Sequence, residues 1–147
     1  MAAARELRAF VERSELEKVE ASVDKAQAML KDAERSLKAA RSIVSVDPKS
    51  ALLLAWDGIA FQALAAALLL AGYRVTTQPG HHRVAVEAGR TLLGQEALLS
   101  RIGALRRLRA RGMYESEAVK REEAIAALDD GEALVAIVRK AVAAARA

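Results

Sequence analysis

The strongest chemical feature of the sequence is an arginine-rich segment that lacks acidic residues. Neither Asp nor Glu occurs between Glu96 and Glu115, although five arginines fall within eleven residues of that interval. These are Arg101, Arg106, Arg107, Arg109 and Arg111. Guanidinium groups form paired hydrogen bonds with phosphate oxygens, and such binding weakens as salt rises. The segment therefore indicates either a solvated basic helix face or a contact for RNA, a nucleotide or another phosphate-bearing ligand.

Arg109 differs from the other arginines because it continues an apolar stripe. Steps of four, three and four residues join Leu98, Ile102, Leu105 and Arg109. At 100° per residue these positions share one helix face, so the guanidinium is expected in the interior or in a cleft. A buried charge without a partner costs several kcal/mol.

Asp57 presents the same problem with the opposite sign, because it interrupts the apolar run 51–72. The economical expectation is that Asp57 and Arg109 meet, or that both line one polar cleft between helices or between subunits. The alternative is that each side chain caps a bundle end or extends to water along its own stem.

Two adjacent histidines, His81 and His82, follow Gly80 at the expected start of a helix. Neighbouring helical residues point about 100° apart, so the pair does not match the spacing of four residues that helical zinc ligands use. The sequence also has no cysteine, no glycine-rich phosphate loop and no pattern typical of a serine hydrolase. The common enzyme classes therefore lack support, and we expect neither a metal nor a cofactor.

Helices must position all of these side chains, and the first long helix is predicted over 14–44. Ser14 and Glu17 have the spacing of a capping box. An apolar seam with steps of three and four follows, and it consists of Leu16, Val19, Val23, Ala26, Leu30, Ala33, Leu37, Ala40 and Val44. Residues 1–13 are predicted to form an N-terminal extension or a short helix.

Three further helical segments follow. Asp47 and Pro48 predict the start of a helix that ends before Gly72, and residues 73–80 are predicted to be a loop. The later segments are expected at 81–93 with a continuation over 95–111, ended by Gly112, and from the turn 114–116 to near the C-terminus. Short connections between long helices favour antiparallel neighbours. The predicted fold is all-α, an up-and-down bundle of four long helices plus a short helix, with one domain over 14–147 and no sheet.

Composition sets the expected compartment. The net charge is +4, and residues 1–13 lack the apolar core of a signal peptide. The run 51–72 is as long as a membrane span, but Asp57 near its middle favours a central bundle helix over a membrane helix. We therefore expect a cytoplasmic protein without a membrane segment.

Three segments together resemble the HEPN superfamily of small helical bundles: 55–59, 80–83 and above all 105–114. In that family an Arg near the end of the third long helix is followed, after four to six residues, by a His. The resemblance implies that this pair cleaves RNA across a two-fold dimer cleft. Arg109 matches the family Arg, but Tyr114 stands where the His is expected and Ala110 where Asn is frequent.

No histidine follows His82, so the general acid or base that the resemblance implies is missing downstream of Arg109. A tyrosine with a pKa near 10 is poorly matched to proton transfer at neutral pH. Arg74 and His81 satisfy the family spacing literally, but they flank the predicted loop, so we interpret that match as chance.

The favoured hypothesis is a HEPN-like domain that acts by binding RNA, a nucleotide or a partner protein through Asp57, the arginines and Tyr114. The resemblance implies a toxin–antitoxin, phage-defence or RNA-handling setting, with a cognate antitoxin or a nucleotidyltransferase-like protein as partner. One alternative is a metal-independent ribonuclease that uses Arg109 with Tyr114, His81 or His82. Another is a structural or adaptor bundle.

We expect a two-fold homodimer with the Arg109 helix near the axis, because this Arg lies on an apolar stripe and the resemblance implies a dimer. Light scattering at micromolar concentration should give twice the chain mass of 15.7 kDa. A homogeneous species at 15.7 kDa would contradict the expectation.

Overall fold

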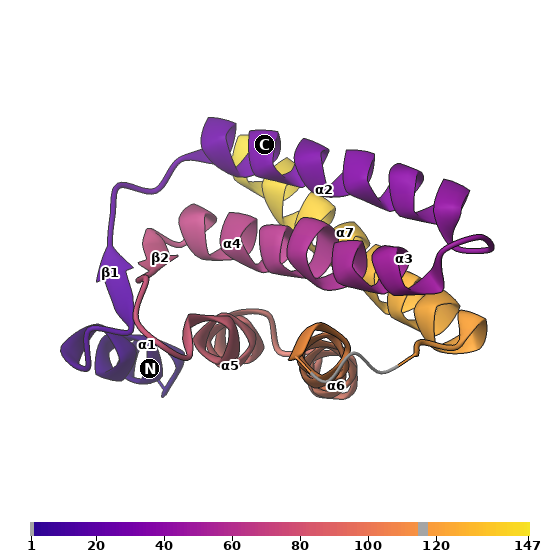
Figure 1. Ribbon diagram of the computed structural model, residues 1–147. Coiled ribbons are helices and arrows are strands. Elements are labelled where there is room, and N and C mark those ends of the chain that lie inside the picture. Colours follow the sequence, from indigo (N-terminus) through magenta and orange to yellow (C-terminus); the bar gives the residue numbers. More distant parts are fainter. Residues whose placement is uncertain (1, 115–117) are drawn as a thin grey trace.

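The computed structural model describes residues 2–114 and 118–147, except for the side chains of Met113 and Tyr114. In chain order its elements are α1 (Ala2–Glu12), β1 (Leu16–Lys18), α2 (Val23–Ile43), α3 (Pro48–Leu54), the π-helical turn η1 (Ala55–Ala60), α4 (Phe61–Leu70), β2 (Tyr73–Val75), α5 (His81–Leu93), α6 (Glu96–Tyr114) and α7 (Arg121–Arg146). The predicted all-α fold is confirmed, and α1 supplies the short additional helix (Figure 1).

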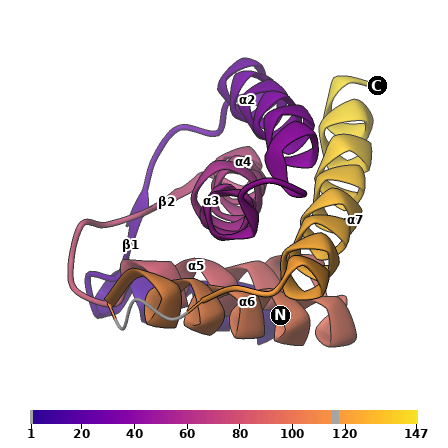
Figure 2. The ribbon, with the colours of Figure 1, turned by 45° about the vertical axis from the view of Figure 1, so that its right-hand side comes forward.

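One long helix, Pro48–Leu70, forms the centre of the fold and comprises α3, η1 and α4. The predicted caps are confirmed at both ends: the Asp47 carboxylate accepts the Ser50 amide at 3.1 Å, and Gly72 follows the helix with a φ of +88°. The helices α2, α5 and α7 pack around it, and Figure 2 shows α3 and α4 between them. We call Pro48–Leu70 the core helix.

The core helix is long and apolar enough, by length and composition, to cross a membrane. Burial in the bundle also explains why this helix is apolar, because Trp56, Ile59 and Leu64 are fully buried against the surrounding helices. A helix that is apolar on most sides is expected at the centre of a bundle.

The predicted start of the first long helix at Ser14 is wrong, because α2 begins at Val23. Ser22 is the N-cap, and its hydroxyl accepts the Lys25 amide at 3.1 Å. Ser14 instead has a φ of +60°, a value that ends α1 and turns the chain away. From Val23 onward the predicted seam is confirmed, since Ala26, Leu30, Ala33 and Ala40 are buried.

Residues 16–18 and 73–75 form a two-stranded antiparallel sheet, which corrects both the prediction of no sheet and the predicted loop. Leu16 pairs with Val75, and the side chains of Glu17 and Arg74 form an ion pair at 2.8 Å. Leu16 is buried in a second small core with Phe10 and Leu68. Tertiary pairing and burial thus override the helical spacing that this segment shares with α2.

Gly94 separates α5 from α6 as predicted, with a φ of +69° that favours glycine. The predicted last residue of this helix, Arg111, is three residues early, because α6 continues past Gly112 to Tyr114. In Figure 1, α6 is seen along its axis, whereas α2 and the core helix run across the view. The α6 helix therefore crosses the core helix and presents one side to η1 and another to α5.

The corrected start of α2 gives a direct stability test. Ser22→Ala should lower the free energy of unfolding by about 1 kcal/mol, because an orphan amide loses its acceptor. Ser14→Ala is the matched control and should change it much less, since no helix begins there. Chemical denaturation of the two variants measures the difference, and equal losses would contradict this assignment.

Candidate functional site

The π-helical turn positions Asp57. Residues 55–60 add a wider turn to the core helix, in which Trp56, Ile59 and Ala60 remain fully buried while Asp57 is half-exposed. Such single π turns inside α-helices occur frequently at functional sites, because they redirect side chains without breaking the helix. Here the turn keeps the apolar side chains inside and leaves a carboxylate at the surface facing α6.

Asp57 and Arg109 form an ion pair, which confirms that they are close. Nη2 of Arg109 lies 3.0 Å from Oδ2 of Asp57, and Nε lies 3.3 Å from the same oxygen. The Arg109 side chain is only 14% exposed, against 44% for Asp57. A guanidinium this deeply placed needs a counter-charge, and the carboxylate supplies it together with two hydrogen bonds. The charge of Arg109 is therefore largely compensated within the chain.

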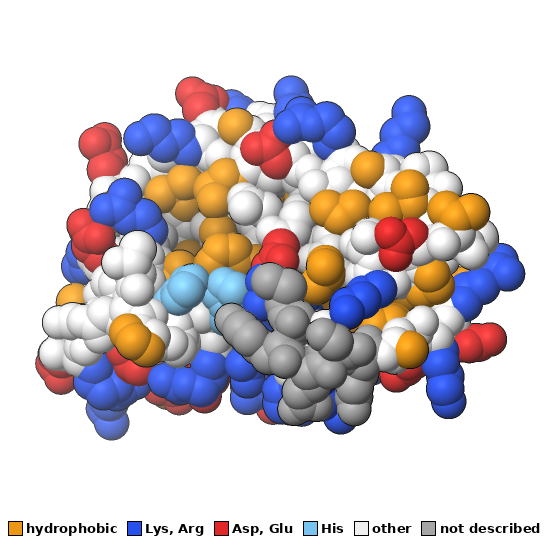
Figure 3. Space-filling view, viewed as in Figure 1, with side chains coloured by type: hydrophobic (Ala, Val, Ile, Leu, Met, Phe, Trp, Pro, Cys, Tyr) orange, Lys and Arg blue, Asp and Glu red, His pale blue; other side chains and the backbone are white. Residues whose placement is uncertain are grey.

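The histidines lie in a cluster of rings beside this ion pair. The His82 ring centroid is 4.9 Å from that of Phe61 and 5.5 Å from that of Trp56, and the two imidazoles are 4.3 Å apart. Figure 3 shows the two histidines adjacent at the surface. Rings from α5 and from the core helix thus pack together where α5 begins.

Hydrogen bonding fixes opposite tautomers for the two histidines. The Trp56 indole, which can only donate, donates to Nδ1 of His82 at 3.0 Å, so that nitrogen carries no proton. Nδ1 of His81 lies 3.2 Å from the Gln78 carbonyl, which can only accept, so that nitrogen carries a proton. When neutral, His82 is protonated at Nε2 and His81 at Nδ1.

Burial lowers the pKa of His82 below its ordinary value, and the positive charges of His81 and Arg109 lower it further. Asp57 acts in the opposite direction, and its effect is smaller than these. Both the hydrogen bond from Trp56 and the electrostatic surroundings therefore favour neutral His82 near pH 7. The positive charge of Arg109 therefore acts on His82 within one chain.

The predicted arginine segment divides among the sides of α6 and does not form one patch. Arg109 points to Asp57, whereas Arg106 and Arg107 line a cavity of about 280 Å³ between α5 and α6. Arg101 and Arg111 line a separate groove between α6 and α7, where Arg101 pairs with Asp130 at 2.9 Å. The structure therefore brings Asp57 and Arg109 together, places His82 near them, and separates the other predicted ligand-binding arginines.

The cavity between α5 and α6 also contains two arginines that sequence reasoning did not assign to a site, Arg83 and Arg90. Their separation of seven residues places them on one helix face. The spacing alone could have predicted that Arg83 and Arg90 share a face of α5. It could not have predicted that this face packs against α6. Trp56 and Phe61, which hold the histidines, were missed because apolar positions in the core helix all resemble core residues.

Tyr114 belongs to α6, but its side chain lies outside the described residues, so its predicted role remains a prediction. Across 2–114 and 118–147, no three His, Cys, Asp or Glu side chains are grouped so that they could hold a metal ion.

Comparison with known proteins gives one match. The family model of the HEPN domain matches residues 26–141, from the first turns of α2 to near the end of α7. No curated protein matches the chain, and neither does any solved structure. The matched region includes the core helix with Asp57, the histidines, and α6 with Arg109. Because the match covers most of the sequence, the chain belongs to the HEPN family.

Proposed function

We propose that this HEPN domain binds RNA or another phosphate-bearing ligand through the α5–α6 side, and that it does not cleave RNA. The observation that carries the proposal is that Arg106 and Arg107 lack ion-pair partners among the described residues. Neither forms an ion pair with any residue of 2–114 or 118–147, although both line the same cavity. Two adjacent cations without an ion-pair partner in the described chain are available to an anionic ligand.

The surroundings of Arg106 support the proposal. Burial lowers the pKa of this guanidinium, and the neighbouring charges of Arg107 and Arg83 lower it further, with Glu87 opposing them. The protein therefore holds a half-buried cation near other cations. A phosphate would offset that repulsion and form charge-assisted hydrogen bonds in its place.

Two features argue against catalysis. Asp57 compensates the charge of Arg109, so this guanidinium is less available to stabilise a developing negative charge on phosphorus. The family His is replaced by Tyr114, and no histidine follows along the chain. A base for the 2′-hydroxyl at neutral pH is therefore missing from the family position.

The ribonuclease alternative has one observation in its favour. His82 lies close enough to Arg109 for the two charges to interact, although it comes from α5 and not from the family position. A histidine beside an arginine is a chemically suitable pair for phosphodiester cleavage. Against this, the hydrogen bond from Trp56 occupies one of the two imidazole nitrogens of His82.

Membership of the HEPN family supports a proposal about the biological setting. We propose a homodimer that acts in a toxin–antitoxin or phage-defence system, with an antitoxin or a nucleotidyltransferase-like protein as partner. A structural or adaptor role is the alternative if no phosphate-bearing ligand binds. A neighbouring gene for a nucleotidyltransferase-like protein would support the toxin–antitoxin setting.

RNA binding should depend on salt through Arg106 and Arg107. Replacing both with Gln should reduce the magnitude of the slope of log K against log salt by about 1.4, since each phosphate contact with a single strand contributes about 0.7. The control pair, Arg35→Gln with Arg139→Gln, removes the same charge from α2 and α7 and should leave the slope unchanged. Fluorescence anisotropy with a short single-stranded RNA measures both slopes. Equal slopes in all three proteins would refute the assignment.

The purified protein should leave RNA intact in the presence of EDTA, and Arg109→Ala should not alter that result. The physical reason is the missing base at the position of Tyr114. Gel analysis of a labelled RNA measures cleavage, and circular dichroism checks that the variant is folded. Robust metal-independent cutting that is abolished by Arg109→Ala or by His82→Gln would establish the ribonuclease alternative.

A further inference from the structure

The cavity between α5 and α6 has the dimensions of a small-ligand site. Its volume of about 280 Å³ is at the lower limit of ordinary ligand pockets, which range from about 300 to 1,000 Å³. Residues from both helices line it: Arg83, Val86, Glu87 and Arg90 from α5, and Ser100, Gly103, Arg106 and Arg107 from α6. A compact ligand fits this space, whereas a duplex or a folded RNA does not.

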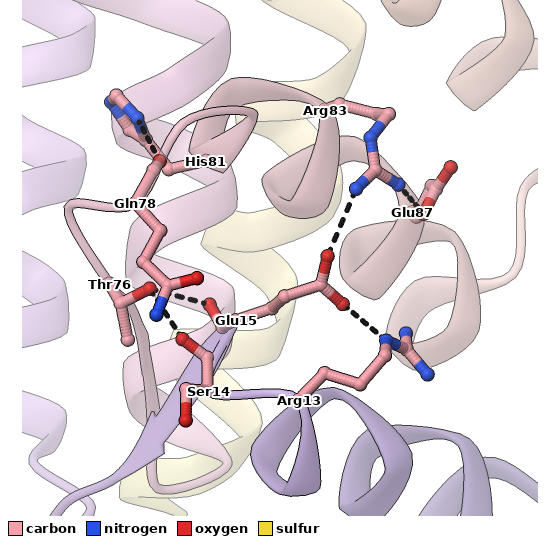
Figure 4. A network of polar contacts seen from close by, with 8 residues as sticks. All are labelled: Arg13, Ser14, Glu15, Thr76, Gln78, His81, Arg83 and Glu87. Atoms are coloured by element: carbon pink, nitrogen blue, oxygen red, sulfur yellow. Dashed lines mark hydrogen bonds and ion pairs between the residues drawn. The ribbon is translucent and has the colours of Figure 1, made fainter.

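Four guanidinium groups and one carboxylate line the cavity, and two of the four, Arg83 and Arg90, have carboxylate partners. Arg83 is held in place, because it donates to Glu87 at 2.7 Å and to Glu15 at 3.0 Å (Figure 4). Glu15 also binds Arg13 at 2.6 Å, and both arginines lower its pKa, with Arg13 contributing most. The ionised Glu15 therefore links the end of α1 to the first turn of α5 and orients one wall of the cavity.

The other three arginines differ in how far they are paired, and only Arg106 and Arg107 lack an ion-pair partner in the described chain. Nε of Arg90 is buried and makes no properly directed hydrogen bond, although Glu96 lies 3.1 Å away. Arg106 and Arg107 form no ion pair within the described chain. Arginine presents five donors in a planar fork that matches phosphate oxygens, so this set is suited to a multiply charged anion.

Gly103 opens the wall between α6 and α5. A Cβ at this position would lie 3.6 Å from Nη1 of Arg107 and 3.7 Å from Cγ1 of Val86, both ordinary contact distances. A side chain here would therefore extend into the cavity without disturbing the backbone. In a helix interior, glycine lowers helix stability by about 1 kcal/mol relative to alanine. A need to keep the cavity open would explain why glycine is present at this position despite that loss.

We propose that this cavity is a discrete site for a compact phosphate group, either inorganic phosphate or the terminal phosphate of a nucleotide. Arg106 and Arg107 bind the phosphate oxygens from α6, and Arg83 and Arg90 form the wall on α5. Because Gly103 has no side chain, the volume between the two walls stays open for the ligand. The inference rests on the proposed phosphate-binding function and deepens it, because it names a pocket of defined size where the proposed function requires only a basic surface.

The test uses phosphate at constant ionic strength, with chloride as the replaced anion. Isothermal titration should detect saturable binding of inorganic phosphate to the wild type, and thermal unfolding should shift upward with phosphate concentration. Arg106→Gln should weaken the binding at least tenfold. The matched control Arg35→Gln, which removes a charge from the exposed surface of α2, should bind phosphate as the wild type does.

The decisive variant is Gly103→Leu, which keeps every arginine and fills the cavity. It should lose saturable phosphate binding, whereas salt-dependent RNA binding, which uses the exposed ends of the same arginines, should decrease much less. Gly103→Ala, which places only a methyl group at an ordinary contact distance, is the control for folding and should bind phosphate as the wild type does. A folded Gly103→Leu that binds phosphate like the wild type would overturn the pocket and leave the proposed function standing. An unchanged salt dependence of RNA binding in the variant that lacks both Arg106 and Arg107 would instead refute the proposed function.

Three ligands separate the sources of the phosphate. Adenosine monophosphate that binds more tightly than inorganic phosphate would show that a nucleotide is recognised, and equal affinities would show that the phosphate alone is recognised. Adenosine that binds as well as adenosine monophosphate would contradict a phosphate site.

Discussion

The ion pair between Asp57 and Arg109 is the interaction on which the arrangement of α6 depends. Arg109 lies on the apolar stripe of α6, and its side chain is almost buried, so α6 can approach η1 only where a carboxylate meets the guanidinium. The π-helical turn provides that carboxylate at the surface of an otherwise apolar core helix. One acidic residue in the core helix thereby permits a basic helix to pack across it.

This pairing also determines which cations remain available. Asp57 compensates the charge of Arg109, and Asp130 compensates that of Arg101. Arg106 and Arg107 face α5 and meet mainly other cations there. Similarly, Trp56 holds His82 through Nδ1, and burial lowers the pKa of this histidine. The charge of Arg109 is thus compensated by Asp57, and His82 is fixed by its hydrogen bond from Trp56. The side of α6 that faces α5, in contrast, carries Arg106 and Arg107 without an ion-pair partner in the described chain. Such a distribution supports the proposed binding function over cleavage.

The sequence was informative wherever a local pattern and burial agreed. The caps and length of the core helix, the break at Gly94 and the proximity of Asp57 to Arg109 all followed from spacing and from the cost of a buried charge. It failed at residues 14–19, because the seam of α2 continues backward in register through Leu16, while the segment actually pairs with Tyr73–Val75. No local pattern marks the π turn. The cavity required knowing which sides of α5 and α6 face each other, which is a tertiary property that spacing alone does not contain.

The most direct test of the account separates the paired arginine from the free ones. Asp57→Asn combined with Arg109→Gln removes both members of the ion pair and leaves the net charge unchanged, so general electrostatic attraction is preserved. The affinity of this double variant for single-stranded RNA, measured by anisotropy at one fixed salt concentration, should fall much less than that of the variant without Arg106 and Arg107, even though α6 loses an ion pair to η1. A loss of affinity as large as that caused by removing Arg106 and Arg107 together, in a variant that unfolds as cooperatively as the wild type, would show that Arg109 contacts the ligand and would contradict the account.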